Sequence, residues 1–203
     1  MKKDILKKSL IVLMMLVSVL VLSGCGNNNE ENNNNTNNES NSTTADDLSS
    51  LPVYNMETLE NYTEYKDEAS GAIVNYPSGW ETLDQDGQKL FRDSTLTGAS
   101  LNINSADIPE AMSFDAFIGA SIEGIKQQMT IDGDVAQEWI NLNGRRAAKI
   151  DYVAKQTDST NVTIEQIVFI ENNKAYILTI AVLSDNYDIV KADIENIVKS
   201  FRI

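Results

Sequence analysis

The chain has 203 residues, enough for one domain or a small pair of domains. Its 30 acidic residues outnumber the 16 basic ones, and this net charge of −14 disfavours nucleic acid, whose phosphates are bound by clustered Lys and Arg. Histidine is absent and cysteine occurs once, which excludes Ser-His-Asp and Cys-His catalysis, histidine or thiolate zinc sites, and a disulfide within the chain. Carboxylate chemistry and the binding of hard cations remain open.

The first 24 residues have the layout of a secretion signal. Four lysines and one aspartate precede an apolar run over residues 10–22, which only Ser18 interrupts. The run holds 13 residues, whereas a membrane-spanning helix needs about 20. A basic start, a short apolar core and small residues before a cut are typical of a cleaved export signal. We therefore expect residues 1–24 to be a signal peptide that is removed.

The signal ends in Leu22-Ser23-Gly24-Cys25, which contains the only cysteine. This order resembles the lipobox of exported bacterial lipoproteins. The resemblance implies cleavage between Gly24 and Cys25 and a diacylglycerol, with palmitate-type acyl chains, on the Cys25 sulfur. Two acyl chains anchor a protein stably, whereas one binds a membrane only marginally. The expected location is the extracytoplasmic face of the cell membrane, and the Asn- and Ile-rich composition is typical of a Gram-positive source.

Residues 25–55 form a predicted tether. Over residues 27–50 nearly every side chain is polar, with Ala45 and Leu48 as the exceptions. Such a segment buries too little apolar surface to offset its conformational entropy, so we expect a disordered coil that spans roughly 30 Å. The chain from Cys25 onward carries 12 basic and 29 acidic residues. Anionic lipid head groups would repel it, so membrane attachment depends on the lipid anchor.

The folded domain is expected over residues 56–203, after a start marked by Pro52. Its first half alternates short apolar runs with turn residues, which indicates strands. These predicted strands cover residues 62–66, 69–76, 88–92 and 99–104. Residues 77–79 and 84–87 have the composition of turns.

Residues 113–129 change to a helical period. Apolar side chains recur at spacings of three and four, which predicts an amphipathic helix packed on a core. The stripe consists of Phe114, Phe117, Ile118, Ile122, Ile125 and Met129. Ser113 is expected to cap the helix, and Asp115 to favour the positive end of its dipole.

The second half is rich in strands and ends in a helix. Strands are predicted at residues 135–142, 146–155, 162–170 and 175–183, with turns at Asn143-Gly144 and Asn172-Asn173. Residues 162–170 are apolar on both faces, which indicates a sheet covered on both sides. The closing helix is predicted over residues 187–201, capped by Ser184 or Asp185. Two helices and antiparallel hairpins without βαβ alternation predict an α+β fold, an antiparallel sheet between helices.

Three short motifs, in this order, resemble the PsbP-like family. They are Tyr76-Pro77-Ser78-Gly79-Trp80, Leu142-Asn143-Gly144-Arg145-Arg146-Ala147, and Ile197-Val198-Lys199-Ser200-Phe201. The resemblance covers roughly residues 60–203. It implies an antiparallel sheet between helices and no catalytic residues, with Trp80 and Phe201 as core side chains.

Two acidic stretches, residues 84–87 and 132–134, suggest a calcium site at first sight. Calcium needs six to eight oxygen ligands at set loop positions, and the closing glutamate of an EF-hand is missing after Gly87. We therefore expect solvated turns here and neither a metal nor another cofactor. The basic pair Arg145-Arg146 is expected at the start of a strand, with an anionic ligand site as the weaker interpretation.

These features predict a non-enzymatic binding module held at the membrane by its lipid. The expected partner is a protein or another component of the cell envelope. An alternative is a hydrolase of cell-wall sugars, which would need two carboxylates about 5–10 Å apart in a cleft. A module that binds divalent cations is the other alternative.

Overall fold

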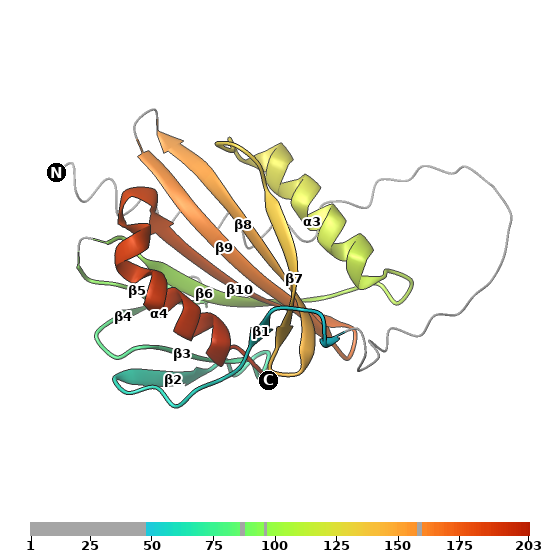
Figure 1. Ribbon diagram of the computed structural model, residues 1–203, viewed down its shortest axis with the longest axis horizontal. Coiled ribbons are helices and arrows are strands. Elements are labelled where there is room, and N and C mark those ends of the chain that lie inside the picture. The colour runs from blue at the N-terminus through green and yellow to red at the C-terminus, as the bar shows by residue number, and fades with distance from the viewer. Residues whose placement is uncertain (1–47, 86–87, 96, 158–159) are drawn as a thin grey trace, which may run out of the picture.

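The computed structural model describes residues 48–203, apart from 86–87, 96 and 158–159, and its elements are arranged in layers (Figure 1). An eight-stranded sheet has the strand order β1-β7-β8-β9-β10-β6-β5-β4. Helix α3 packs on one face of this sheet, and α4 packs on the other together with the β2–β3 hairpin. The predicted α+β fold is thereby confirmed.

Each half of the domain consists of strands, most of them paired as antiparallel hairpins, followed by one helix. In chain order they are β1 (Val53–Tyr54), β2 (Tyr62–Lys66), β3 (Ile73–Pro77), β4 (Glu81–Gln85), β5 (Gln88–Arg92), β6 (Ser100–Asp107), α3 (Phe114–Gln128), β7 (Ala136–Leu142), β8 (Arg145–Thr157), β9 (Thr160–Glu171), β10 (Lys174–Leu183), the 3₁₀ turn η1 (Ser184–Asn186) and α4 (Tyr187–Ser200).

Apolar side chains of the central strands point alternately to the two faces of the sheet and form one apolar cluster on each face. On β8 the predicted set Ala148, Ile150, Tyr152 and Ala154 faces α3. On β9, Ile167 and Phe169 face α4 instead. Because β9 is apolar on both faces, it lies inside the sheet with a layer on each side.

The side chains expected as core residues lie in the α4-side cluster. Phe201 is fully buried there and its ring packs 5.0 Å from that of Phe169. Trp80 is only half-buried and packs against the same cluster from outside.

The predicted N-terminal cap is present at α3 and absent at α4. Ser113 Oγ accepts a hydrogen bond from the Ala116 N–H, as predicted. The predicted cap of α4 is wrong, because η1 precedes the helix and its N-cap residue, Asn186, makes no side-chain cap bond. The Ser184 hydroxyl pairs with Thr163 Oγ1 at 2.9 Å instead.

The strand predicted to begin at residue 69 begins at Ile73. The Asp67 carboxylate accepts hydrogen bonds from the N–H and hydroxyl of Ser70, at 2.8 and 2.5 Å, and Gly71 adopts a φ of 82°. Aspartate and glycine together therefore form a local turn where alternation alone indicated a strand.

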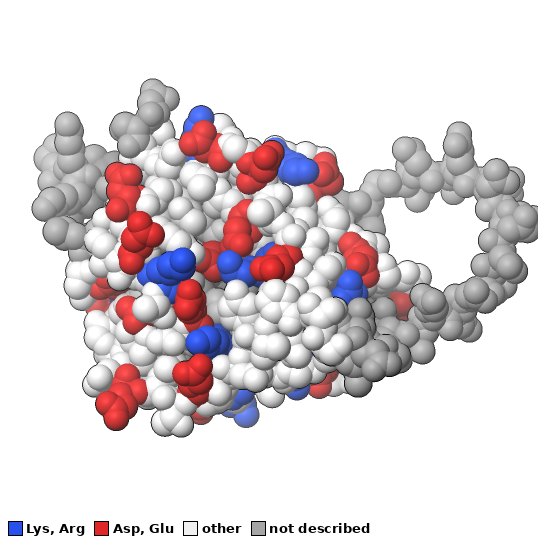
Figure 2. Space-filling view, in the orientation of Figure 1, with Lys and Arg blue, Asp and Glu red and all other residues white. Residues whose placement is uncertain are grey.

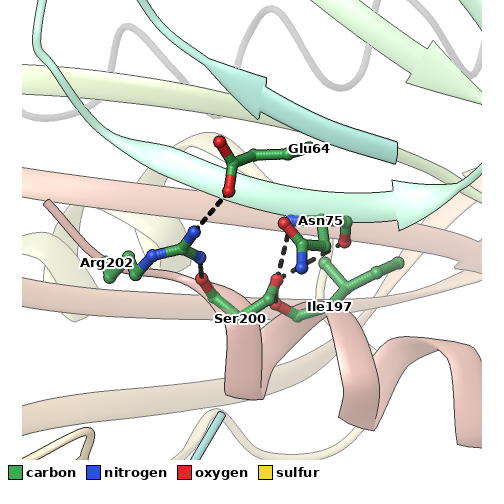
Figure 3. Close-up of polar contacts among 5 residues, drawn as sticks. All are labelled: Glu64, Asn75, Ile197, Ser200 and Arg202. Carbon is green, nitrogen blue, oxygen red and sulfur yellow. Dashed lines mark hydrogen bonds and ion pairs between the residues drawn. The ribbon is translucent and has the colours of Figure 1, made fainter. Parts of the chain in front are cut away.

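The C-terminal end of α4 is fixed to the β2–β3 hairpin by polar contacts (Figure 3). Ser200 Oγ accepts from the Asn75 N–H at 2.8 Å and donates to the Ile197 carbonyl at 2.7 Å. Arg202 donates to the Ser200 carbonyl at 2.7 Å and forms an ion pair with Glu64 at 2.6 Å. These contacts hold the two-stranded hairpin against the helix that covers the main sheet.

Strand β1 adds a parallel neighbour at one edge of the sheet. Val53 pairs with Asn141, and Tyr54 with Leu142 of β7. Both residues lie inside the range expected to be tether, so the described chain joins the sheet before residue 56.

Candidate functional site

Charged side chains converge on the α4 face of the sheet, beside the helix. Lys149 and Asp151 alternate with apolar residues on β8, and Glu165 is directly opposite Asp151 on β9. Tyr187, the first residue of α4, completes this set. We call these four residues the Lys149 cluster.

The contacts within the Lys149 cluster are short. Lys149 Nζ lies 2.9 Å from Asp151 Oδ2 and 3.3 Å from Glu165 Oε2. The Tyr187 hydroxyl donates to Glu165 Oε1 at 2.5 Å. The Lys149 side chain is 16% exposed and that of Glu165 only 5%. Figure 2 shows charged side chains of both signs meeting near the middle of this face, between α4 and strands β7 and β8.

The two carboxylates of the cluster stabilise the charged form of Lys149. Burial by itself would lower the pKa of Lys149, but Asp151 and Glu165 outweigh this effect and raise the pKa above its usual value. Burial, followed by the hydrogen bond to Glu165, also raises the pKa of the Tyr187 hydroxyl. At neutral pH the lysine is therefore cationic and the tyrosine neutral.

Tyr54 of β1 lies at the rim of the Lys149 cluster. It is half-buried and packs against the α4-side core. Burial raises the pKa of its hydroxyl, while nearby Lys149 lowers it and nearby Glu138 raises it again. The segment that leads into the domain thus contributes a side chain to this face.

The arrangement suits recognition better than proton transfer. Both carboxylates are bound to Lys149, and one carboxylate is also bound to Tyr187, so each charge already has a partner. Asp151 Oδ1 is buried and has no hydrogen-bond partner.

Sequence reasoning did not identify this cluster, although one signal was available. Glu165 is a charged residue within a strand that is otherwise mostly apolar on both faces. A glutamate in such a strand needs a buried partner, and the alternation of β8 places Lys149 and Asp151 on the same face.

The predicted lipidation site, Cys25, and the cleavage position at Gly24 lie outside the described residues. The two acidic stretches carry ion pairs at their described residues. Asp84 pairs with Lys89 at 2.7 Å, and Asp132 pairs with Lys155 at 3.0 Å. Within residues 48–203, leaving out the gaps, no three His, Cys, Asp or Glu side chains are grouped so as to hold a metal ion.

Both members of the basic pair have structural contacts. Arg145 pairs with Glu171 at 2.7 Å and lies over the Phe169 ring. Arg146 makes two hydrogen bonds to Asp115, of 3.0 and 3.2 Å, and its guanidinium lies 3.7 Å from the centre of the Trp139 ring. The two guanidinium groups connect β8 to its neighbours on opposite faces, which leaves no support for the anionic ligand site.

Comparisons with known proteins agree with this architecture. The PsbP family profile matches residues 60–203. A cyanobacterial PsbP from Synechocystis is similar in structure, with 18% identity and a TM-score of 0.54 over 72% of this chain and 94% of that one. The Ran-binding protein Mog1p of Saccharomyces cerevisiae has 10% identity and a TM-score of 0.51 over 71% and 96% of the two chains.

A third similar structure is LpqN of Mycobacterium tuberculosis, described as involved in cell envelope biogenesis. It has 10% identity and a TM-score of 0.50 over 69% of this chain and 88% of that one. A comparison with curated protein sequences finds no match. Among the helices that the structure describes, none is both long and apolar enough to cross a membrane.

Proposed function

Because the chain belongs to the PsbP family, we propose that its domain is a non-enzymatic binding module attached by a diacylglycerol on Cys25 to the extracytoplasmic face of the cell membrane. Its partner is a protein or another component of the cell envelope. The observation that carries this proposal is the Lys149 cluster, a set of charges on a sheet face that α4 covers only in part.

The fold supports a binding role by analogy alone. Proteins that share it include one described as Ran-binding and one described as involved in cell envelope biogenesis. One fold hosts many functions, so the function depends on the residues of the site. Here the site combines the paired charges of the Lys149 cluster with Tyr54 of the edge strand β1.

The hydrolase alternative requires one carboxyl group that is free to donate a proton and a second that acts as base or nucleophile. Asp151 and Glu165 are cross-strand neighbours, but both bind the same lysine. With Lys149 Nζ 2.9 and 3.3 Å from their oxygens, neither carboxyl group is the free one that the reaction requires as its proton donor.

Crosslinking in intact cells tests the binding role. A photoreactive residue at Glu195, an exposed position of α4 on the cluster side, is expected to capture a specific partner. The matched control is Glu123 on α3, whose side chain is 63% exposed and lies on the other face of the sheet. Turnover of an envelope substrate, together with no capture specific to Glu195, would contradict the proposal.

Lipid attachment has its own test. The change Cys25→Ser removes the sulfur that the acyl glycerol needs, so metabolic labelling with a radioactive fatty acid is expected to mark the original chain and not the variant. Fractionation of the same cells should move the variant from membranes to the soluble fraction. A serine variant that retains the label would refute the anchor while leaving the binding role open.

A further inference from the structure

Strand β7 is paired along its whole length on one side only. Strand β8 pairs with every residue of Ala136–Leu142. On the outer side, β1 pairs with Asn141 and Leu142 alone. Within the described part of the chain, residues 136–140 therefore form an open edge of the eight-stranded sheet.

The backbone groups along this open edge point outward. The Asn141 N–H donates to the Pro52 carbonyl at 2.8 Å, across the outer side of β7. Because backbone groups of a strand alternate in direction, Trp139 and Gln137 direct their N–H and C=O groups to the same side. No backbone hydrogen bond within the described part of the chain occupies them. These backbone groups lie in line with β1 and are available to pair with a further strand.

The chain that supplies β1 does not extend along these positions. Pro52 has no N–H and so cannot donate to a ladder. Just before it, the Leu51 N–H bonds to the Leu48 carbonyl at 3.2 Å, so residues 48–51 form a turn and not an extended strand. Ala136, Gln137 and Glu138 are exposed as a result.

The charged residues around the open edge indicate what kind of segment can pair with it. Glu138 is opposite Lys149 in the β7–β8 register and lies on the same face as Asp151 and Glu165. Around Tyr54, which precedes this edge, the glutamates Glu138, Glu165 and Glu195 outnumber the one lysine that acts on its hydroxyl, Lys149. A second copy paired antiparallel about residue 138 would bring Glu138 next to its own equivalent, and like charges on adjacent strands destabilise pairing.

We propose that residues 136–140 of β7 bind an extended basic segment of a protein partner. This segment adds a strand to the sheet, paired with β7 and in line with β1. This proposal rests on the binding role proposed above and names the partner class. Main-chain hydrogen bonds to Gln137 and Trp139 hold the segment, and a Lys or Arg side chain of the segment contacts Glu138. Such edge pairing uses the groups that an exposed strand leaves unpaired.

Peptide binding to the full chain, purified in detergent micelles, tests the proposal. The probes are two capped peptides of equal length, one alternating Lys and Val and one alternating Glu and Val. Titration calorimetry is expected to show saturable binding of the Lys-Val peptide and none of the Glu-Val peptide. The change Glu138→Lys should weaken binding of the Lys-Val peptide about tenfold, as expected where charges at an interface become repulsive.

A matched pair of variants separates the backbone from the side chain. Gln137→Pro removes the outward N–H without touching the bonds to β8, and Gln137→Ala keeps that N–H. We expect the proline variant to lose about tenfold in affinity, on the order of one hydrogen bond, and the alanine variant to bind like the original chain. Urea unfolding checks that each variant folds, and Glu138→Lys stands in for Gln137→Pro if that variant does not.

Each outcome decides the proposal. The proposal is overturned if the Lys-Val peptide does not bind, or if the proline and alanine variants bind it equally. It is also overturned if sedimentation shows a dimer that Gln137→Pro dissociates. If crosslinking at Glu195 captures the same partner in cells that carry Gln137→Pro, the edge proposal fails and the binding role stands. If no partner is captured in cells and an envelope substrate is turned over, the binding role fails, and peptide binding as expected would then show only that the edge can pair with a basic strand.

Discussion

Lys149 lies between two carboxylates on a sheet face that is otherwise largely apolar. Removing one member of a buried ion pair leaves the other charge without compensation, which costs more than the pair itself contributes. Glu165 is only 5% exposed, and its carboxylate is contacted by the Lys149 ammonium and the Tyr187 hydroxyl. We therefore expect stability to be sensitive to Lys149 and much less sensitive to Lys155, the other lysine of the same strand.

The change Lys149→Met is expected to lower the free energy of unfolding by about 3 kcal/mol. The control is Lys155→Met on the same strand, whose ion pair with Asp132 is nearly half exposed and is therefore expected to contribute much less. Urea unfolding followed by tryptophan fluorescence measures both. Adding Glu165→Gln to Lys149→Met should recover part of the loss, and equal costs for the two lysines would contradict the account.

Ser200 shows how one hydroxyl can connect two elements. Its oxygen accepts from the Asn75 N–H of β3 and its proton goes to the Ile197 carbonyl (Figure 3). The change Ser200→Ala leaves a backbone donor of β3 without a partner next to a buried position and should cost about 2 kcal/mol. Ser78→Ala, at an exposed serine whose hydroxyl pairs with that of Thr63, is expected to change the same measurement by less than about 0.5 kcal/mol.

At the scale of elements, the turn between β7 and β8 does more than reverse the chain. Asn143 adopts a φ of 52°, as its Asn-Gly pair predicts. Its side chain also accepts from the Met56 N–H at 2.7 Å and donates to the carbonyls of Lys199 and Phe201 at 2.9 and 3.3 Å. One residue thus holds the chain after β1 and the end of α4 together.

Asn143→Gly keeps the backbone conformation and removes these three bonds. We expect it to lower the free energy of unfolding by about 2 kcal/mol and to speed hydrogen exchange at the Met56 amide. Asn172→Gly is the matched control, because Asn172 has a similar φ of 51° and an exposed side chain. A similar effect of the two changes would show that only the conformation of Asn143 matters.

Elements with a strong period were predictable, and those made by distant contacts were not. The stripes of α3 and α4 and the β7–β10 hairpins depend on local spacing and turn residues, and they occur as predicted. Strand β1 has two residues and exists because Asn141 and Asn143 bond to it across 87 or more positions of sequence. No local pattern marks such a strand, since its partners are far away along the chain.

At the scale of the whole molecule, the same limit applies to the candidate site. The sequence shows which residues carry charge, and it predicts the faces of strands, but the pairing of β8 with β9 decides that Asp151 is opposite Glu165. The predicted anchor at Cys25 depends on a short linear motif and needs no tertiary contact. A linear motif can be identified without a fold, whereas a cluster assembled from β8, β9 and α4 requires the register of the sheet.

Stability should depend on pH mainly outside the neutral range. The chain has no histidine, so no side chain with an ordinary pKa near 6.5 titrates between pH 6 and 8. Burial, followed by contacts with acidic residues, raises the pKa of Tyr62 and of Tyr65 to about 12. In the unfolded chain these hydroxyls ionise near pH 10.

Because the folded state holds these protons longer, their contribution to stability is complete below pH 10 and is lost as pH rises from 10 through about 12. We expect a constant urea midpoint between pH 6 and 9 and a steep decline above 10. The double change Tyr62→Phe and Tyr65→Phe should lower the midpoint at pH 7, since the hydrogen bonds to Asp193 and Asp67 are lost, and make the alkaline decline shallower. An equally steep decline in the double variant would show that other groups, such as the lysines, dominate the alkaline unfolding.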